Sequence, residues 1–285
     1  MSVPLRPSRP TFAELFDARV ATGAHLCVGL DPSPATIPDI IDRTLAAHDR
    51  VVSFNECIVD ATRDIAAAFK PNAAFYEAMG AAGWEALRRT AQYIRRVAPE
   101  VPVLLDAKRA DIGSTNEGYV RAVFDEVGAD AVTVHPYLGE QALRPFLDRP
   151  GTGIFVLART SNPGAGEFQD LLIDGLPLYR QVAKRVAVEW TAQARLGLVV
   201  GATYPRELEE VRADIPPDVP ILIPGVGAQG GDLDASVRAN VEAGSRAFII
   251  SVSRGIAGAA QGDDPAAAIR AAAQEFDAQI RRAAA

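Results

Sequence analysis

The sequence contains very little cysteine and very little lysine. Only two of its 285 residues are cysteine, Cys27 and Cys57, and their spacing matches neither a disulfide framework nor a metal site. The 29 basic residues include only three lysines, Lys70, Lys108 and Lys184. Because guanidinium is a poor proton donor, a lysine kept in such an arginine-rich chain is a candidate for a site that needs a titratable ammonium. For Lys184 we favour an ordinary surface position.

Long apolar runs are also missing. No stretch approaches the about 20 apolar residues of a membrane span, and the first ten residues, MSVPLRPSRP, lack the apolar core of a signal peptide. The net charge of −7 offers no broad basic surface for nucleic acid or an acidic membrane. We therefore expect a cytoplasmic protein without nucleic-acid or membrane partners, in which a local site holds any anionic ligand.

What the sequence does contain is an alternation of short apolar runs with longer segments of helical spacing. Eight runs are predicted as strands: His25–Leu30, Ala66–Lys70, Val101–Asp106, Ala131–His135, Gly153–Ala158, Leu196–Val200, Ile221–Pro224 and Ala247–Ser251. The predicted helices between and after them are Asp49–Ala66, Trp84–Val97, Glu117–Val127, Glu140–Leu147, Leu178–Gln193, Pro205–Ala213, Asp232–Ala243 and Pro265–Arg282. A leading helix is predicted to start at Thr11, where Glu14 completes a capping box.

Eight strands that alternate with helices predict parallel pairing through crossover connections. No Gly-x-Gly-x-x-Gly turn follows the first strand, so a closed barrel is favoured over an open doubly wound sheet. We predict a single α/β domain, a (β/α)8 TIM barrel over residues 1–285 with a leading N-terminal helix. The two longest connections, Pro32–Asp49 and Arg159–Pro177, would then lie at the C-terminal mouth, where such barrels build active sites.

Charged residues gather at the end of the third predicted strand, in LLDAKRADIGST. Asp106 and Lys108 are two residues apart, so on a regular strand both point into the barrel mouth. Asp111 follows on the exit loop, and Lys70 ends the second strand. Carboxylates around an ammonium favour its charged form, which can act as a general acid. A solvated ion-pair cluster is the alternative, but charges at the end of a buried strand favour a functional site.

Glycine-rich loops follow the last two predicted strands. PGVGAQGGD places Gln229 just before a predicted helix, and SVSRGI places Arg254 ahead of a glycine. Loops at these positions are the recurring phosphate site of such barrels, and an arginine adds a bidentate cation. Tight turns alone are the alternative for either loop. Two such loops at the expected strand ends favour phosphate.

Polar residues also end the first and fifth predicted strands. Asp31 in CVGLDPSP can accept hydrogen bonds from a sugar hydroxyl, with a turn aspartate before proline as the alternative. Ser161 in LARTSNPGAG can contact a planar, amide-like ligand edge, with a simple Ser or Asx turn as the alternative. His135 in TVHPY has no evident carboxylate partner, so we expect a packed, hydrogen-bonded histidine.

With these pieces in place, the chain resembles the orotidine 5′-phosphate decarboxylase family over nearly its whole length. The matching segments, each at a predicted strand end and in the family's order, are GLDPSP, FKPN, LLDAKRADIGST, TSNPGA, PGVGAQGG and SRGI. DAKRADIGST is highly specific within this barrel superfamily. The insertions around Pro34–Asp49 and Gly164–Pro177 are similar to those of the longer bacterial subgroup, type 2.

The resemblance implies conversion of orotidine 5′-phosphate to UMP and CO₂, the last step of de novo pyrimidine synthesis, with no cofactor and no metal. Lys108 would stabilise the charge that develops at C6 and deliver the proton. Asp106 would lie beside the departing carboxylate. Lys70 and Asp31 would hold ribose hydroxyls and orient the array of catalytic charges, which the family builds from Lys70, Asp106, Lys108 and Asp111.

The resemblance further implies a homodimer with shared active sites, in which Asp111 and Thr115 reach into the partner's pocket. Ser161 would read the pyrimidine edge, with Thr160 as the alternative source of the hydroxyl. The remaining binding residues implied by the family are Gln229, between base and phosphate, and Arg254, on the phosphate.

Two other functions stay open at this point. A Mg²⁺-dependent sugar-phosphate lyase or synthase of the same superfamily, such as hexulose-phosphate synthase, uses a similar Asp-x-Lys-x-x-Asp string. A noncatalytic nucleotide-binding barrel is the second alternative. The intact Lys108 with both aspartates argues against it, because a binding module needs no proton donor among buried carboxylates.

Overall fold

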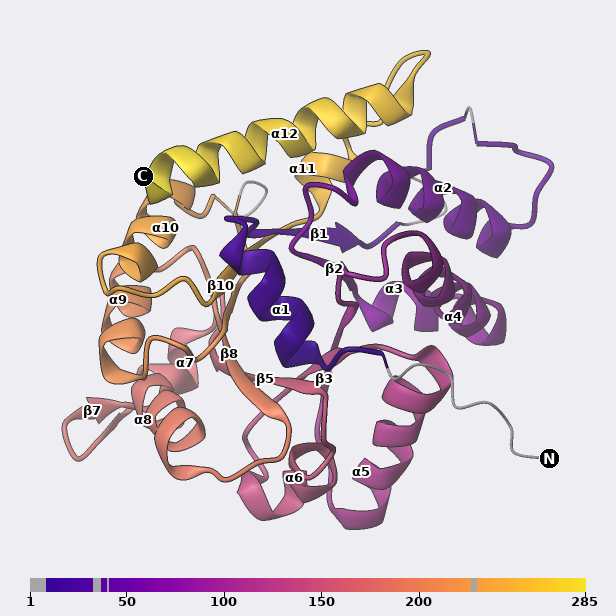
Figure 1. Ribbon diagram of the computed structural model, residues 1–285. Helices are drawn as coiled ribbons and strands as arrows, with labels where there is room; N and C mark the ends of the chain where they lie inside the picture. Colours follow the sequence, from indigo (N-terminus) through magenta and orange to yellow (C-terminus); the bar gives the residue numbers. More distant parts are fainter. Residues whose placement is uncertain (1–8, 33–36, 40, 227–229) are drawn as a thin grey trace.

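The computed structural model describes residues 9–32, 37–39, 41–226 and 230–285, and its centre is a barrel of eight parallel strands (Figure 1). The strands follow one another around the barrel in the order β2-β1-β10-β9-β8-β5-β4-β3. Single bridges from Phe69 to Val103 and from Asn72 to Asp106 join the two ends of this sheet. The strands are β1 (Leu26–Leu30), β2 (Ala68–Pro71), β3 (Leu104–Arg109), β4 (Ala131–Val134), β5 (Gly153–Arg159), β8 (Arg195–Val200), β9 (Ile221–Ile223) and β10 (Phe248–Val252).

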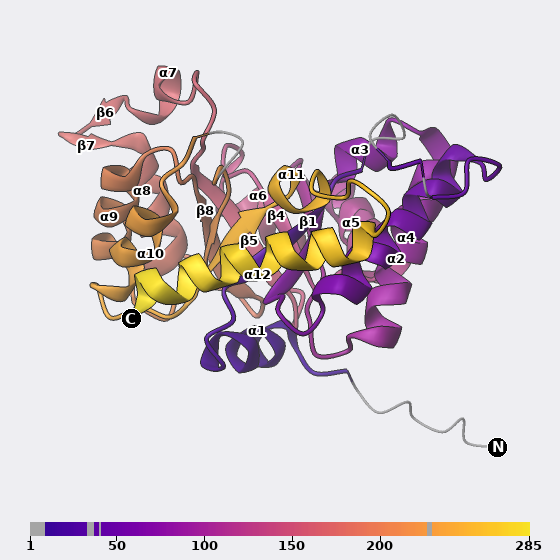
Figure 2. The ribbon, with the colours of Figure 1, turned by 90° about the horizontal axis from the view of Figure 1, so that it is seen from above.

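Helices cover the outside of the barrel, as Figures 1 and 2 show, so the predicted (β/α)8 barrel is confirmed. They are α2 (Ala47–Thr62), α3 (Ala73–Glu77), α4 (Gly80–Val97), α5 (Gly113–Val120) with the π-helical η2 (Arg121–Val127), α6 (Gly139–Leu147), α8 (Leu178–Lys184) with the π-helical η3 (Arg185–Glu189), α9 (Pro205–Asp214), α10 (Leu233–Val241) and α12 (Pro265–Ala284). In the part of the chain that the structure describes, no helix is long and apolar enough to cross a membrane.

The core has two layers because successive strand side chains point to opposite faces. Inward-facing residues such as Leu104, Ala131 and Phe155 fill the barrel, and their neighbours on the same strands pack against the helices. On β4, Ala131 faces the interior and Val132 faces the helices. Thr133, one residue further on, therefore faces the interior near the C-terminal end of the barrel.

The leading helix α1 (Phe12–Ala21) closes the end of the barrel opposite the mouth (Figure 2). The Thr11 hydroxyl accepts from the Glu14 amide at 3.3 Å, and the Glu14 carboxylate accepts from the Thr11 amide at 2.7 Å, so the predicted capping box is confirmed. The Phe12 ring packs edge-on against Phe155, with 5.7 Å between ring centroids. Through these contacts α1 belongs to the interior core of the barrel.

The structure adds short elements that the sequence patterns did not predict. Helix α3 follows β2 directly, and the Asn72 side chain caps it by accepting from the Ala74 amide at 3.2 Å. The long connection after β5 contains α7 (Gly166–Gln169) and a hairpin of β6 (Leu172–Ile173) and β7 (Leu176–Pro177). Elements of two to five residues carry too few periodic positions to be recognised from hydropathy.

Candidate active site

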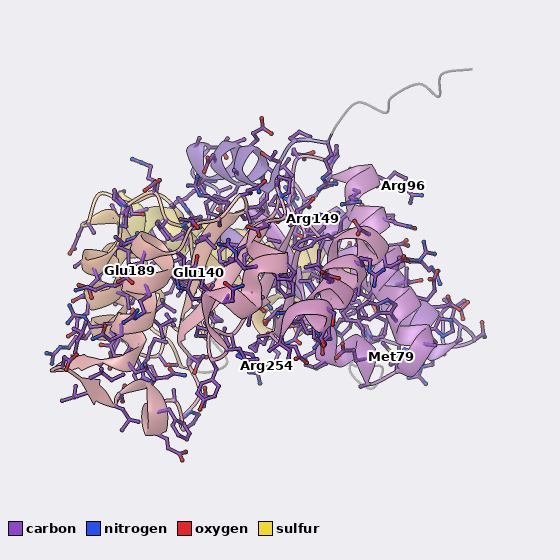
Figure 3. All side chains as sticks on the ribbon, turned by 90° about the horizontal axis from the view of Figure 1, so that it is seen from below. Met79, Arg96, Glu140, Arg149, Glu189 and Arg254 are labelled. Carbon is purple, nitrogen blue, oxygen red and sulfur yellow. The ribbon has the colours of Figure 1, made fainter. Side chains whose placement is uncertain are left out.

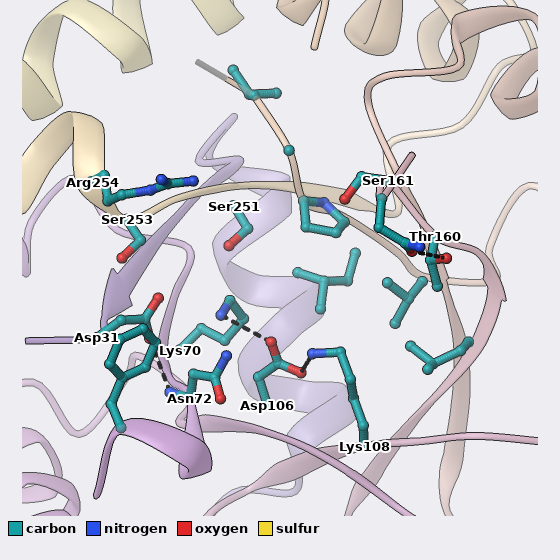
Figure 4. Close-up of a pocket in the computed structure, with 18 of the residues that line it drawn as sticks. Asp31, Lys70, Asn72, Asp106, Lys108, Thr160, Ser161, Ser251, Ser253 and Arg254 are labelled. Carbon is teal, nitrogen blue, oxygen red and sulfur yellow. Dashed lines mark hydrogen bonds and ion pairs between the residues drawn. The ribbon is translucent and has the colours of Figure 1, made fainter. Parts of the chain in front are cut away.

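A pocket of about 750 Å³ opens at the C-terminal ends of the barrel strands. Figure 3 shows Arg254, one of its lining residues, on the same side of the molecule as the β6–β7 hairpin and opposite α1. Ten polar or charged lining residues are labelled in Figure 4: Asp31, Lys70, Asn72, Asp106, Lys108, Thr160, Ser161, Ser251, Ser253 and Arg254.

The floor of the pocket carries an ion cluster of Lys70, Asp106 and Lys108. One carboxylate oxygen of Asp106 accepts from Lys108 Nζ at 2.7 Å, and the other lies 3.4 Å from Lys70 Nζ. The Asp106 and Lys70 side chains are only 13% and 6% exposed, whereas Lys108 is 49% exposed. Lys108 is therefore the member of the cluster that a ligand can reach most easily.

In this cluster, the neighbouring charges affect the pKa values of Asp106 and Lys70 more than burial does. Burial by itself would raise the pKa of the Asp106 carboxyl, but the two ammonium groups and hydrogen bonds from Lys108 and Thr133 lower it to about 2. Burial would lower the pKa of Lys70, but the charges of Asp31 and Asp106 outweigh it and raise that pKa. Asp106 is thus an anion and Lys70 a cation at neutral pH.

Lys108 reaches Asp106 through an irregular strand, not through the regular alternation that the sequence analysis assumed. The step from Leu105 to Arg109 on β3 faces the shorter step from Val132 to Val134 on β4, so β3 bulges between them. Within the bulge Lys108 has a positive φ of 47°, which non-glycine residues seldom adopt. The predicted strand Val101–Asp106 accordingly starts later, at Leu104, and runs on to Arg109.

Asp31 lies beside the cluster at the end of β1, and Asn72 holds it there. The backbone amide of Asn72 donates to the Asp31 carboxylate at 3.0 Å, so the start of α3 fixes the end of β1. Below them the Tyr76 hydroxyl donates to the Leu30 carbonyl at 2.9 Å and accepts from Asn55 at 2.9 Å. Asn72 belongs to the FKPN segment, but its position in the sequence predicted no role for it.

The loop after β5 supplies the neighbouring wall, with Thr160, Ser161 and Asn162 lining the pocket. The Thr160 hydroxyl donates to the side-chain oxygen Oδ1 of Asn162 at 2.7 Å and accepts from the side-chain amide of Gln169 at 2.9 Å. The donor position of the Thr160 hydroxyl is therefore already used within the loop.

Arg254 lies across the pocket from Lys108 (Figure 4), close to the backbone of two glycine-containing segments. These segments contribute Gly225 and Val226 after β9, and Ser253 and Gly255 around the start of α11 (Arg254–Ala257). The predicted phosphate residue Gln229 lies outside the described residues.

Among the polar residues at or after the predicted strand ends, Asp111, Thr115 and His135 do not line this pocket. The Asp111 carboxylate accepts from the adjacent Ile112 amide at 2.7 Å, and Thr115 is exposed on α5. The backbone amide of His135 donates to the Arg109 carbonyl at 3.1 Å. The sequence predicted that Lys108 lies between two carboxylates. Within one chain, the structure places only the Asp106 carboxylate beside it.

The fold and the pocket together define an α/β-barrel enzyme with an ammonium–carboxylate cluster on one side of its mouth and an arginine on the other. A family model described as Orotidine 5'-phosphate decarboxylase / HUMPS family matches residues 24–272. The chain belongs to this family.

Relatives and solved structures extend this finding over almost the whole chain. The chain is 48% identical over 273 residues to the Orotidine 5'-phosphate decarboxylase of Roseiflexus castenholzii, covering 95% of this chain and 97% of that protein. The structure is similar to that of Leishmania donovani OMP decarboxylase, with a TM-score of 0.79, 38% identity and coverage of 95% and 99% of the two chains. It is also similar to Leishmania donovani UMP synthase, with a TM-score of 0.83 and 40% identity. This match covers 96% of this chain but only 56% of the synthase.

Proposed function

We propose that this protein decarboxylates orotidine 5′-phosphate to UMP and CO₂, the last step of pyrimidine nucleotide synthesis, without a metal or organic cofactor. The observation that carries the proposal is the Lys70–Asp106–Lys108 cluster facing Arg254 across one pocket. The name of the Roseiflexus castenholzii relative and its 48% identity support the same activity.

Lys108 is the proposed catalytic acid. When the bond between C6 and the carboxylate breaks, its electron pair stays on C6 and CO₂ leaves. The Lys108 ammonium, held at 2.7 Å from Asp106, stabilises that charge and transfers a proton to C6, and the resulting amine regains a proton from water. Asp106 stays ionised throughout, because its pKa is about 2.

The other pocket residues have proposed binding roles. Asp31 and Lys70 hold ribose hydroxyls, and Ser161 reads the pyrimidine edge. Arg254 holds the phosphate dianion, with Gln229 bridging base and phosphate. Binding energy from the phosphate, which does not react, can be used to orient the base against Lys108.

The proposal includes a homodimer, in which Asp111 and Thr115 complete the partner's pocket. Two exposed apolar side chains support it: Ile112, next to Asp111 in the chain, is 63% exposed, and Tyr137, which follows the neighbouring strand β4, is 92% exposed. A cytoplasmic location is also proposed. Its support is that Cys27 and Cys57 are both free thiols, as is usual in reducing compartments.

The proposed function is tested by mixing purified protein with orotidine 5′-phosphate and an excess of chelator and following the ultraviolet change to UMP. We expect full turnover, and Lys108→Ala to abolish it while UMP binding remains measurable by calorimetry. Lys184→Ala is the matched control, because Lys184 lies outside the pocket and pairs with Asp214 at 3.3 Å.

Each other outcome points elsewhere. Turnover that stops in chelator and returns with Mg²⁺ would favour metal-assisted chemistry of the sugar-phosphate type. UMP binding without any turnover by the unmodified protein would favour a nucleotide-binding barrel. Substantial turnover by Lys108→Ala would exclude Lys108 as the proton donor.

A further inference from the structure

We infer that Thr133, on β4, is a positioning residue that sets the geometry of the Asp106–Lys108 pair through its hydroxyl group. The inference rests on the proposed function, because the pair is the one assigned to proton transfer. Thr133 is 1% exposed and does not line the pocket, so it acts through Asp106 and Lys108 and not on the ligand.

The position of Thr133 in the sheet explains how it can do this. It lies between Val132 and Val134, directly opposite the bulge of β3, where the regular ladder of backbone hydrogen bonds is interrupted. Backbone amides in such a gap lose their partners in the ladder and need another acceptor, since an unpaired amide costs free energy where water does not reach it. The Thr133 hydroxyl is that acceptor: the amides of Ala107 and Lys108 donate to it at 3.0 and 2.9 Å.

The same hydroxyl donates its proton to the Asp106 carboxylate at 2.8 Å. A hydroxyl has one donor and two acceptor positions, and all three are used here. The acceptor of this bond is the Asp106 oxygen that also accepts from Lys108 Nζ at 2.7 Å. One atom therefore connects the backbone of Lys108, the carboxylate of Asp106 and, through that carboxylate, the ammonium of Lys108.

This arrangement matters because Lys108 holds a strained conformation. A non-glycine residue with a φ of 47° persists only where its surroundings determine it. Nearly half of the Lys108 side chain is exposed, so packing alone does not hold the ammonium in place. Without the Thr133 hydroxyl the bulge is free to relax, and the ammonium moves away from the position that it occupies beside Asp106.

The test compares variants that differ in the hydroxyl. Thr133→Val keeps the size of the side chain and removes all three hydrogen bonds, whereas Thr133→Ser keeps the hydroxyl. We expect Thr133→Val to lower kcat about 100-fold with a UMP dissociation constant within about threefold of wild type, because a displaced acid impairs chemistry more than binding. Thr133→Ser should restore kcat to within about threefold.

A buried hydroxyl elsewhere provides the matched control. Thr62 on α2 is fully buried, and its hydroxyl donates to the Ile58 carbonyl at 2.7 Å within the same helix. Thr62→Val should leave kcat unchanged. Amide hydrogen exchange at Ala107 and Lys108 gives a reading that does not depend on turnover, with faster exchange expected in Thr133→Val than in Thr133→Ser.

Several outcomes would overturn the inference while leaving the proposed function intact. One is a kcat for Thr133→Val within about tenfold of an active wild type. Another is a loss of UMP binding that matches the loss of kcat and is not rescued by serine, which indicates a general structural role. If Thr133→Val does not fold, Thr133→Cys takes its place, because a thiol is only a weak hydrogen-bond partner. An inactive wild type would instead remove the proposed function itself.

Discussion

At the scale of single residues, the pocket depends on a carboxylate that stays charged although it is largely buried. An isolated carboxylate in this position would tend to take up a proton. Asp106 avoids this because Lys70 and Lys108 both face it and the Thr133 hydroxyl donates to it. The three charges support one another, so each substitution changes the state of the other two.

The lowered pKa of Asp106 predicts a contribution to acid stability. Its folded-state pKa of about 2 lies below the ordinary value near 4, so the contribution is fully present above pH about 4 and is lost as the pH falls towards 2. Between pH 4 and 2, chemical denaturation should show that the free energy of unfolding of wild type falls by about 2 kcal/mol more than that of Asp106→Asn.

The control for this measurement is Asp174→Asn, at an exposed residue in the turn between β6 and β7. The free energy of unfolding of Asp174→Asn should fall with pH by the same amount as that of wild type. Parallel curves for Asp106→Asn and wild type between pH 4 and 2 would show that the neighbouring cations do not hold Asp106 ionised.

At the scale of elements, the two ends of the barrel have separate tasks. Helix α1 fills the N-terminal end, where a Cβ on Gly153 would clash with the Phe12 ring. The loops at the other end carry the pocket. Stability contributed by α1 should therefore be separable from activity.

Phe12→Ala is expected to lower the free energy of unfolding by about 3–5 kcal/mol, because it removes a buried ring that packs against Phe155. The kcat of the folded variant should stay near wild type, since α1 lies at the opposite end from the pocket. Denaturant unfolding and turnover at 25 °C check both expectations.

Phe168→Ala is the matched control, because this ring on α7 is 64% exposed and its removal should change stability by less than about 0.5 kcal/mol. A similar loss of stability in both variants, or a large fall of kcat in Phe12→Ala, would show that α1 is not the separate structural element described above.

The elements also show how far sequence patterns extend. Strands buried on both faces are apolar over most of their length, so all eight were recognised, and β5 begins at the predicted Gly153. The bulge in β3 was not recognised, because it depends on Thr133, which is distant in sequence and has no special hydropathy. For the same reason, the contact between Asp106 and Lys108 was predicted correctly, but the regular strand alternation from which it was predicted is wrong.

At the scale of the whole molecule, the proposed dimer makes a prediction about mixed subunits. If Asp111 serves the partner's pocket, a dimer of one Lys108→Ala chain and one Asp111→Ala chain has one pocket with both defects and one pocket that is intact. Mixing the two inactive variants in equal amounts, with subunit exchange, should then restore about a quarter of wild-type activity.

A second pairing serves as the control for the mixing experiment. Lys108→Ala mixed with Asp106→Asn should stay inactive, because both substitutions remove groups from the same chain's cluster. Sedimentation should show a dimer in every case. A monomer with full activity, or no recovery on mixing exchanged Lys108→Ala and Asp111→Ala dimers, would contradict the shared site.

The sequence by itself determined the barrel and the strand ends that carry Asp31, Lys70, Asp106 and Arg254. Hydropathy period and the position of a residue in its strand are local properties, and the ends of parallel strands meet at one mouth. Only the tertiary structure decided that β3 bulges at Lys108 and that the Thr133 hydroxyl accepts from the Lys108 amide there. These depend on hydrogen bonds and distances between separate strands, which no pattern along one segment encodes.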